Sequence, residues 1–250
     1  MSLVKSAGFL EEILLASEDI RRCYGSLAKL ARHLEEPVMI TGSLATNWHL
    51  LENGRRINKQ RLNDIDVVVE GVTSLSASLS RDFLIRHFHP TRDGGRILIM
   101  LIDEEHATRI DVFTPATRTL TRRLTGFAID DIACRVVAAE DLSAKLLSII
   151  YPITRGEPVE PKYVEHFRLL STVIDRATMK DVWREYRKES HPRDFAEAAE
   201  AVERSITAHP GLLQTGCYSQ DINEACSWCC QSERFPLAPL SRIHAIMGYV

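Results

Sequence analysis

Residues 64–69 read Asp-Ile-Asp-Val-Val-Val, a run of two acids and four β-branched residues. Its β-branched residues favour a strand. Side chains alternate between the two faces of a strand, so Asp64 and Asp66 are predicted to leave one face while Ile65 and Val67 leave the other. A pair of this kind is also typical of an exposed strand edge, so the rest of the chain must supply further acids before a site is indicated.

A third acid has the same setting. Asp111 lies between Ile110 and Val112 in a second predicted strand, residues 108–113. If the two strands are neighbours, three carboxylates converge, and their mutual repulsion requires a counter-charge. Oxygen ligands of this kind suit Mg²⁺, which keeps water and substrate phosphates in its other positions. The sequence therefore predicts a site for one or two Mg²⁺ ions.

A short strand at residues 38–40 runs into Gly42-Ser43 and then into a helix predicted to reach residue 51. The first backbone N–H groups of a helix, together with its dipole, favour a bound anion. Gly42 would let the backbone approach closely, and the Ser43 hydroxyl adds a donor. A phosphate-binding turn beside a metal held by carboxylates is the equipment for phosphoryl or nucleotidyl transfer.

The first half of the chain alternates strand and helix patterns, whereas the second half is helical in pattern. Strands are expected at 96–102 and 108–113, joined as an antiparallel hairpin, and residues 116–137 are ambiguous. Apolar residues at helical spacing predict one long or broken helix over 9–34. Further helices are predicted over 74–82, 140–150, 164–174, 178–188, 195–206 and, more weakly, 220–232. We therefore predict an α/β domain over residues 1–138 and an all-helical domain over 139–250, which together form a cleft.

Composition narrows the function classes. With 250 residues, 45% of them hydrophobic, the chain can bury a continuous core. The 31 basic and 34 acidic residues nearly balance, which does not favour a protein that coats nucleic acid. Its longest apolar stretches are far shorter than the roughly 18 residues of a membrane span. The first residues lack the pattern of a secretory signal, so the expected location is the cytoplasm.

The cysteines near the end of the sequence raise the question of a zinc site. Cys226 and Cys229 have C-x-x-C spacing, but a second pair of ligands at recognisable spacing is missing. We therefore predict that both pack on a helix without zinc. No P-loop, G-x-G-x-x-G, H-E-x-x-H or nucleophile elbow is present, so the main competing enzyme classes are not indicated.

Taken in order, Gly42-Ser43, Asp64-Ile65-Asp66 and Arg109-Ile110-Asp111-Val112 resemble the DNA polymerase beta-like nucleotidyltransferase superfamily. Within it, residues 40–45 and 141–147 look most like the bacterial AbiEii-type group, some of whose members are toxins of toxin-antitoxin systems. The resemblance implies a mixed β-sheet core flanked by helices. It also implies binding of ATP or another nucleoside triphosphate with Mg²⁺, and transfer of a nucleoside monophosphate to a hydroxyl with release of pyrophosphate.

The resemblance also implies roles for individual residues. Asp64 and Asp66 would hold the metals, and Asp111 would share the catalytic metal and help to deprotonate the attacking hydroxyl. Gly42 and Ser43 would hold the β- and γ-phosphates.

Lys145 would add a positive charge to the triphosphate, although a solvated helix lysine is an equally good interpretation of this residue. The alternative function is a catalytically idle member of the same fold that binds nucleotide or a protein partner. The acceptor stays open among RNA, protein and a small hydroxyl compound. The nucleotide and the oligomeric state are also open.

Overall fold

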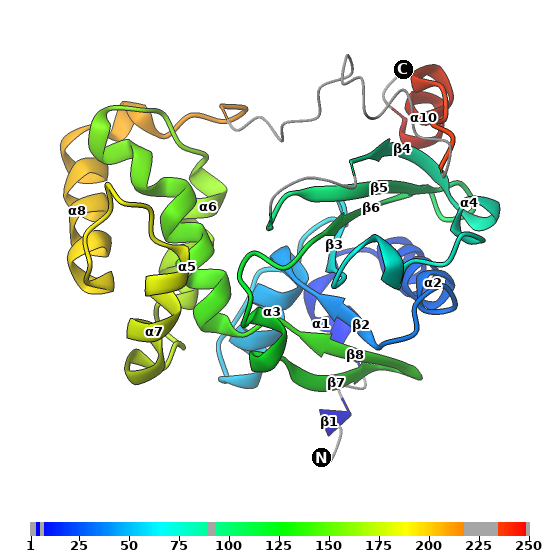
Figure 1. The fold of residues 1–250 in the computed structure, drawn as a ribbon, viewed down its shortest axis with the longest axis horizontal. Coiled ribbons are helices and arrows are strands. Elements are labelled where there is room, and N and C mark those ends of the chain that lie inside the picture. The colour runs from blue at the N-terminus through cyan, green and yellow to red at the C-terminus, as the bar shows by residue number, and fades with distance from the viewer. Residues whose placement is uncertain (1–3, 6–7, 90–93, 218–234, 249–250) are drawn as a thin grey trace. The chain divides into compact units, whose positions relative to one another are not determined.

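The structure is a computed structural model, and it describes residues 4–5, 8–89, 94–217 and 235–248 (Figure 1). The chain divides into two compact units. The first comprises residues 1–47, 57–137 and 222–250, and the second comprises residues 48–56 and 138–221. The main change of unit, between Val137 and Ala138, falls one residue before the predicted domain boundary.

An eight-stranded mixed sheet forms the centre of the first unit, in the order β1-β7-β8-β2-β3-β6-β5-β4. Its strands are β1 (Val4–Lys5), β2 (Val38–Ile40), β3 (Ile65–Val68), β4 (Leu84–Phe88), β5 (Ile97–Asp103), β6 (Thr108–Phe113), β7 (Thr125–Ile129) and β8 (Ile132–Val136). The α/β class with a mixed sheet flanked by helices is confirmed. The ambiguous stretch 116–137 contains β7 and β8, which pair as an antiparallel hairpin.

Strand directions place the two acidic strands side by side. β3 pairs in parallel with β6, which brings together segments more than forty positions apart in the chain. β5 and β6 form the predicted antiparallel hairpin. β2 runs antiparallel to β3 and parallel to β8, so the end of β2 lies beside the strand that carries Asp66. The sheet therefore positions the site at neighbouring strands near its middle.

The helices of the first unit are α1 (Phe9–Ile13), α2 (Ser17–Ala31), α4 (Leu79–Asp82) and α10 (Leu240–Met247), with 3₁₀ turns at Val72–Ser74 and Leu120–Arg123. The pattern over 9–34 is broken after Ile13 because the backbone there leaves the helix and pairs with Gln60. The Leu15 N–H donates to the Gln60 carbonyl at 2.9 Å, and the Gln60 N–H donates to the Ile13 carbonyl at 2.9 Å.

Helix α2 covers the sheet, packing against β2, β6 and β8 (Figure 1). The side chains of Cys23, Leu27 and Leu30 are fully buried on its inner face, at the 3–4 residue spacing of an amphipathic helix. At 15 residues it is the longest described helix. In the described part of the chain, no helix combines the length and the apolar character needed to cross a membrane.

Helix α3 (Gly42–Glu52) starts directly after β2. Its residues up to Asn47 group with the first unit, and those from Trp48 group with the second. The predicted strand, tight turn and helix start at residues 38–43 are therefore present.

The second unit is a helical bundle. It contains α5 (Ala139–Ile150), α6 (Pro161–Leu170), α7 (Arg176–Tyr186) and α8 (Phe195–Ala208), with 3₁₀ turns at Tyr151–Arg155 and Pro210–Leu212. Helix α5 packs against α6, α7 and α8. Asp175 and Asp194 cap α7 and α8 by accepting hydrogen bonds from the first backbone N–H groups, and Pro161 occupies the first turn of α6, where no N–H is needed.

The described part of the C-terminal segment groups with the sheet, whereas the predicted helical domain extended to residue 250. Phe235 is fully buried and its ring meets Phe88 of β4 edge to face, with 5.0 Å between centroids. The Ala238 N–H donates to the Ile85 carbonyl at 2.8 Å. The sequence does not show that this segment packs against the sheet, because the amphipathic pattern of α10 does not specify which surface it packs against. The predicted helix at 220–232 lies outside the described residues.

Candidate active site

Asp66 and Asp111 are direct partners in the parallel pairing of β3 with β6, and Asp64 stands two residues before Asp66. One carboxylate oxygen from each of the three lies within 4.8 Å of the other two. The structure therefore brings together the three acids that the sequence singled out. Strand alternation explains this, because residues two apart share a face and paired residues on adjacent strands point the same way. We call Asp64, Asp66 and Asp111 the acid triad.

The chemistry of the acid triad suits a hard divalent cation. All its donors are carboxylate oxygens, which are the ligands that Mg²⁺ prefers. Asp111 is fully buried, whereas Asp64 and Asp66 are partly exposed. One side of the group is thus held within the protein, and the other is open to an incoming ligand. A site of this form can bind a cation that also binds a substrate.

The turn between β2 and α3 lies directly against the acid triad. Gly42 has a φ of +64°, in the left-handed region that favours glycine. A Cβ at Gly42 would overlap the Oδ2 atom of Asp66. In addition, the Thr41 N–H donates to the Asp66 carbonyl at 3.0 Å. Glycine is therefore required here both by backbone conformation and by the space that the carboxylate fills.

Helix α3 begins at Gly42, so its first N–H groups are placed beside Asp66. The first four N–H groups of an α-helix have no partner within the helix and carry the positive end of its dipole. Ser43 is partly exposed in this first turn. Thr46 secures the turn, because its hydroxyl donates to the Gly42 carbonyl at 3.0 Å. The arrangement places anion-binding groups next to cation-binding groups.

Arg109 is a residue of the site to which the sequence analysis gave no role. Its Nε donates to Oδ1 of Asp111 at 2.8 Å, and its Nη2 donates to Oδ2 at 2.5 Å. The signal was present in the sequence, because Arg109 and Asp111 are two apart on one strand and share a face.

The charges of Arg109 and Asp111 influence each other. Burial raises the pKa of the Asp111 carboxyl above its usual value, and the nearby Asp64 charge adds to the rise, although the Arg109 hydrogen bonds oppose it. Burial acts to lower the pKa of Arg109, but its hydrogen bonds with Asp111 and the triad's negative charges outweigh burial and raise it. Arg109 therefore stays cationic against the buried carboxylate.

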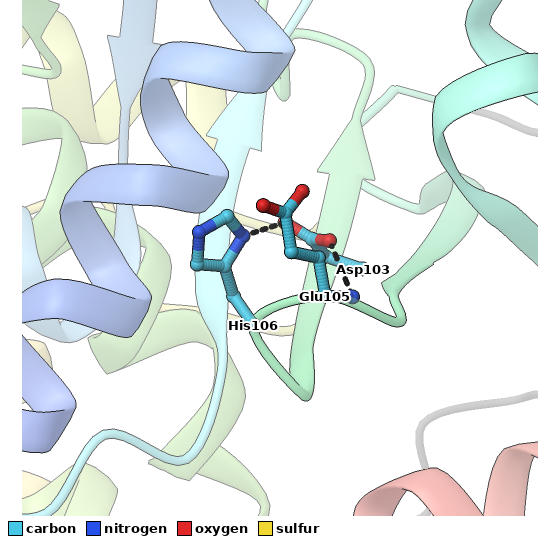
Figure 2. Close-up of side chains that lie close together, drawn as sticks. All are labelled: Asp103, Glu105 and His106. Carbon is cyan, nitrogen blue, oxygen red and sulfur yellow. Dashed lines mark hydrogen bonds and ion pairs between the residues drawn. The ribbon is translucent and has the colours of Figure 1, made fainter.

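A second group with possible metal ligands, Asp103, Glu105 and His106, lies at the turn between β5 and β6 (Figure 2). A protein cation already occupies this group. Lys29 of α2 places its Nζ 2.6 Å from Asp103 and 2.9 Å from Glu105. Asp103 is fully buried and also accepts hydrogen bonds from Ser26 and from the His106 ring. This group is therefore a link between α2 and the hairpin, and it is a poor candidate for a metal site.

Two other predictions stay untested. Lys145 lies on α5 in the second unit and is partly buried, and its role toward a triphosphate stays a prediction. Cys226 and Cys229 lie outside the described residues, so the prediction of zinc-free packing also stays open.

Comparison with known proteins adds no family assignment. No protein-family model, curated protein or solved structure matches the chain. The features of the chain that bear on its function are therefore the acid triad, the turn at Gly42 and Arg109.

Proposed function

We propose that the chain is a metal-dependent nucleotidyltransferase that moves a nucleoside monophosphate from a nucleoside triphosphate to a hydroxyl group. The observation that carries this proposal is the acid triad on adjacent strands, with the N-terminus of α3 against Asp66. A triphosphate is a polyanion that binds through divalent cations and backbone N–H groups. The site offers ligands for both, because the start of α3 lies against Asp66 of the acid triad.

In this proposal, Asp64, Asp66 and Asp111 hold one or two Mg²⁺ ions. A cation held by these residues would supply charge neutralisation at the phosphate oxygens and would favour deprotonation of the attacking hydroxyl. The first N–H groups of α3 and the Ser43 hydroxyl hold the phosphates that leave. Asp111 is our candidate for assisting removal of the hydroxyl proton, because it would share the catalytic metal with the attacking hydroxyl.

The reaction balances without an oxidant or reductant. The acceptor oxygen forms a bond to the α-phosphorus, and the bond from that phosphorus to the bridging oxygen breaks. The electron pair leaves with pyrophosphate, and the hydroxyl proton passes to the base. Catalysis of this kind depends mainly on positioning and on charge neutralisation, which are the functions we assign to the site residues.

The proposal is tested by incubating the protein with each of the four α-labelled ribonucleoside triphosphates, Mg²⁺ and a cell extract. We expect label to appear on one class of macromolecule or metabolite. In Asp66→Asn the label should fall to background, while thermal stability without metal holds or rises because repulsion within the triad is reduced. Asp181→Asn is the matched control, because it removes an exposed carboxylate on α7 that pairs with Arg184.

The outcomes separate the enzyme from its alternative. Full transfer by Asp66→Asn would contradict the assignment of the acid triad. Metal-dependent binding of the triphosphate without transfer to any acceptor would instead identify a catalytically idle, nucleotide-binding protein. The nature of the labelled product would distinguish RNA, protein and small-molecule acceptors.

A further inference from the structure

We propose that Arg109 is a built-in counter-ion of the acid triad that competes with the divalent cation for Asp111. In the metal-free protein it neutralises and holds the buried carboxylate, and it gives up at least one of the two Asp111 oxygens when the cation binds. Arg109 is on this view a positioning residue that sets metal affinity. This inference rests on the proposed function, because it takes the acid triad as the metal site.

The geometry leaves Asp111 no oxygen that Arg109 does not already contact. Both oxygens accept hydrogen bonds from the same guanidinium, at 2.8 and 2.5 Å. A fork of this kind uses the directions along which a carboxylate binds its partners best. A cation that binds Asp111 along these directions must therefore displace one of these N–H groups, and a cation on the remaining lone pairs binds against the positive charge of Arg109.

Arg109 is the partner in this pair that reaches solvent. Its side chain is 24% exposed, whereas Asp111 is 0% exposed. The carboxylate is fixed in the sheet, so any rearrangement must come from the arginine. Asp111 has an apolar residue on either side along β6, Ile110 and Val112, both fully buried on the opposite face.

Charge also favours competition. Arg109 is attracted by Asp64 and Asp66 as well as by Asp111, so it partly neutralises the whole acid triad. Removing this positive charge raises the attraction for a divalent cation in proportion to the cation's double charge. Removing Arg109 also removes the hydrogen bonds that orient the Asp111 carboxylate, and this loss acts to weaken cation binding. This effect is the smaller one, because β6 already fixes the backbone and the carboxylate is packed within the sheet.

The test measures binding of Mn²⁺ alone by calorimetry, at one fixed pH, to the full chain and its variants. We expect Arg109→Gln to bind Mn²⁺ at least tenfold more tightly than the wild type and to unfold at lower temperature without metal. Arg109→Lys keeps the charge but cannot form the fork. Arg109→Lys should bind Mn²⁺ at least threefold more tightly than the wild type. It replaces Arg109→Gln in the test if that variant does not fold.

Two further variants are controls for the measurement of Mn²⁺ affinity. Arg242→Gln removes an exposed arginine that forks onto Glu104, and it should leave Mn²⁺ affinity unchanged. Asp64→Asn should weaken binding if the acid triad is the metal site.

Equal or weaker binding by Arg109→Gln and Arg109→Lys, with Asp64→Asn weakened as expected, would overturn the inference and leave the proposed function standing. If Asp64→Asn binds like the wild type, or if no variant binds Mn²⁺, both the inference and the metal-dependent function fail. Two results together would support both the inference and the proposed function: the Arg109 variants bind Mn²⁺ more tightly, and the Asp64→Asn substitution abolishes this binding.

Discussion

Gly42 is required both by its backbone conformation and by its position against Asp66. Alanine there would face two costs, a positive φ worth about 1–2 kcal/mol and the overlap of its Cβ with Asp66. Gly54 has nearly the same φ, +66°, but a Cβ there would meet no atom within 4 Å. The pair therefore separates backbone strain from crowding of the acid triad.

We expect Gly42→Ala to lower the free energy of unfolding by at least about 2 kcal/mol and to weaken Mn²⁺ binding. Gly54→Ala should cost only the backbone strain, about 1–2 kcal/mol, and leave Mn²⁺ binding unchanged. Chemical denaturation and calorimetry measure the two quantities. Similar losses of metal affinity in both variants would show that the approach of Gly42 to Asp66 does not matter for the site.

His191 is a buried histidine in the second unit, and its chemistry predicts a dependence of stability on pH. Its ring stacks on Trp183 at 5.7 Å and lies 4.4 Å from the Tyr151 ring, and its Nδ1 accepts a hydrogen bond from the Lys188 N–H. Burial, aided by the charges of Lys188, Arg155 and Arg187, lowers its pKa to about 4. The folded protein therefore favours the neutral ring.

Acidification should remove the stability contributed by neutral His191. The unfolded chain binds a proton near pH 6.5 and the folded chain only near pH 4, so stability is lost as the pH falls through this window. The loss is up to about 3 kcal/mol relative to His191→Phe, which cannot titrate. Denaturation curves between pH 7 and pH 4 measure it, with the exposed His209→Phe as control. A constant difference between wild type and His191→Phe would contradict the assignment.

At the scale of elements, α2 and β5 are joined by a buried ion pair. Lys29 is 10% exposed and Asp103 is fully buried, and the two meet at 2.6 Å. Burial acts to raise the pKa of Asp103, but its hydrogen bonds from Lys29, His106 and Ser26 outweigh this and lower it. The carboxylate is thus kept charged inside the protein by its partners.

We expect Lys29→Met to lower the free energy of unfolding by about 3 kcal/mol, because it leaves a buried carboxylate without its cation. Arg242→Met breaks an exposed ion pair to Glu104 and should cost less than about 1 kcal/mol. Urea denaturation compares the two variants. Equal effects would mean that Asp103 reaches solvent or finds another partner when Lys29 is lost.

At the scale of the whole molecule, the described residues of the C-terminal segment, 235–248, group with the unit that contains the sheet. Phe235→Ala should destabilise the first unit by about 3 kcal/mol, since it empties a fully buried position against Phe88. Hydrogen exchange should become faster in β4 and stay unchanged in α5–α8. Leu169→Ala, at a 38% exposed position on α6, is the control and should alter neither region. Faster exchange in α5–α8 with Phe235→Ala would contradict the grouping of this segment with the sheet.

The elements that were predicted well are those whose pattern is local. The strand at 38–40, the start of α3, the β5–β6 hairpin and the helices of the second unit follow from side-chain alternation, helical spacing and turn residues, all of which act within a few positions. The break after Ile13 and the assignment of β7 and β8 were less certain from sequence. The break depends on the pairing of Leu14 with Gln60, and β7 and β8 depend on pairing with each other. Hydrophobic periodicity carries no information about which segments pair.

The sequence alone determined which acids are available to the site and on which strand faces they lie, because a strand alternates its side chains whatever it pairs with. Only the tertiary structure decided that β3 and β6 are neighbours, that the turn at Gly42 touches Asp66, and that Arg109 holds both oxygens of Asp111. The tertiary structure also decided that Phe235 packs against Phe88 of β4, at the edge of the sheet. These features depend on contacts between distant segments, whose free energy comes from burial and charge pairing across the fold and leaves no periodic trace in the chain.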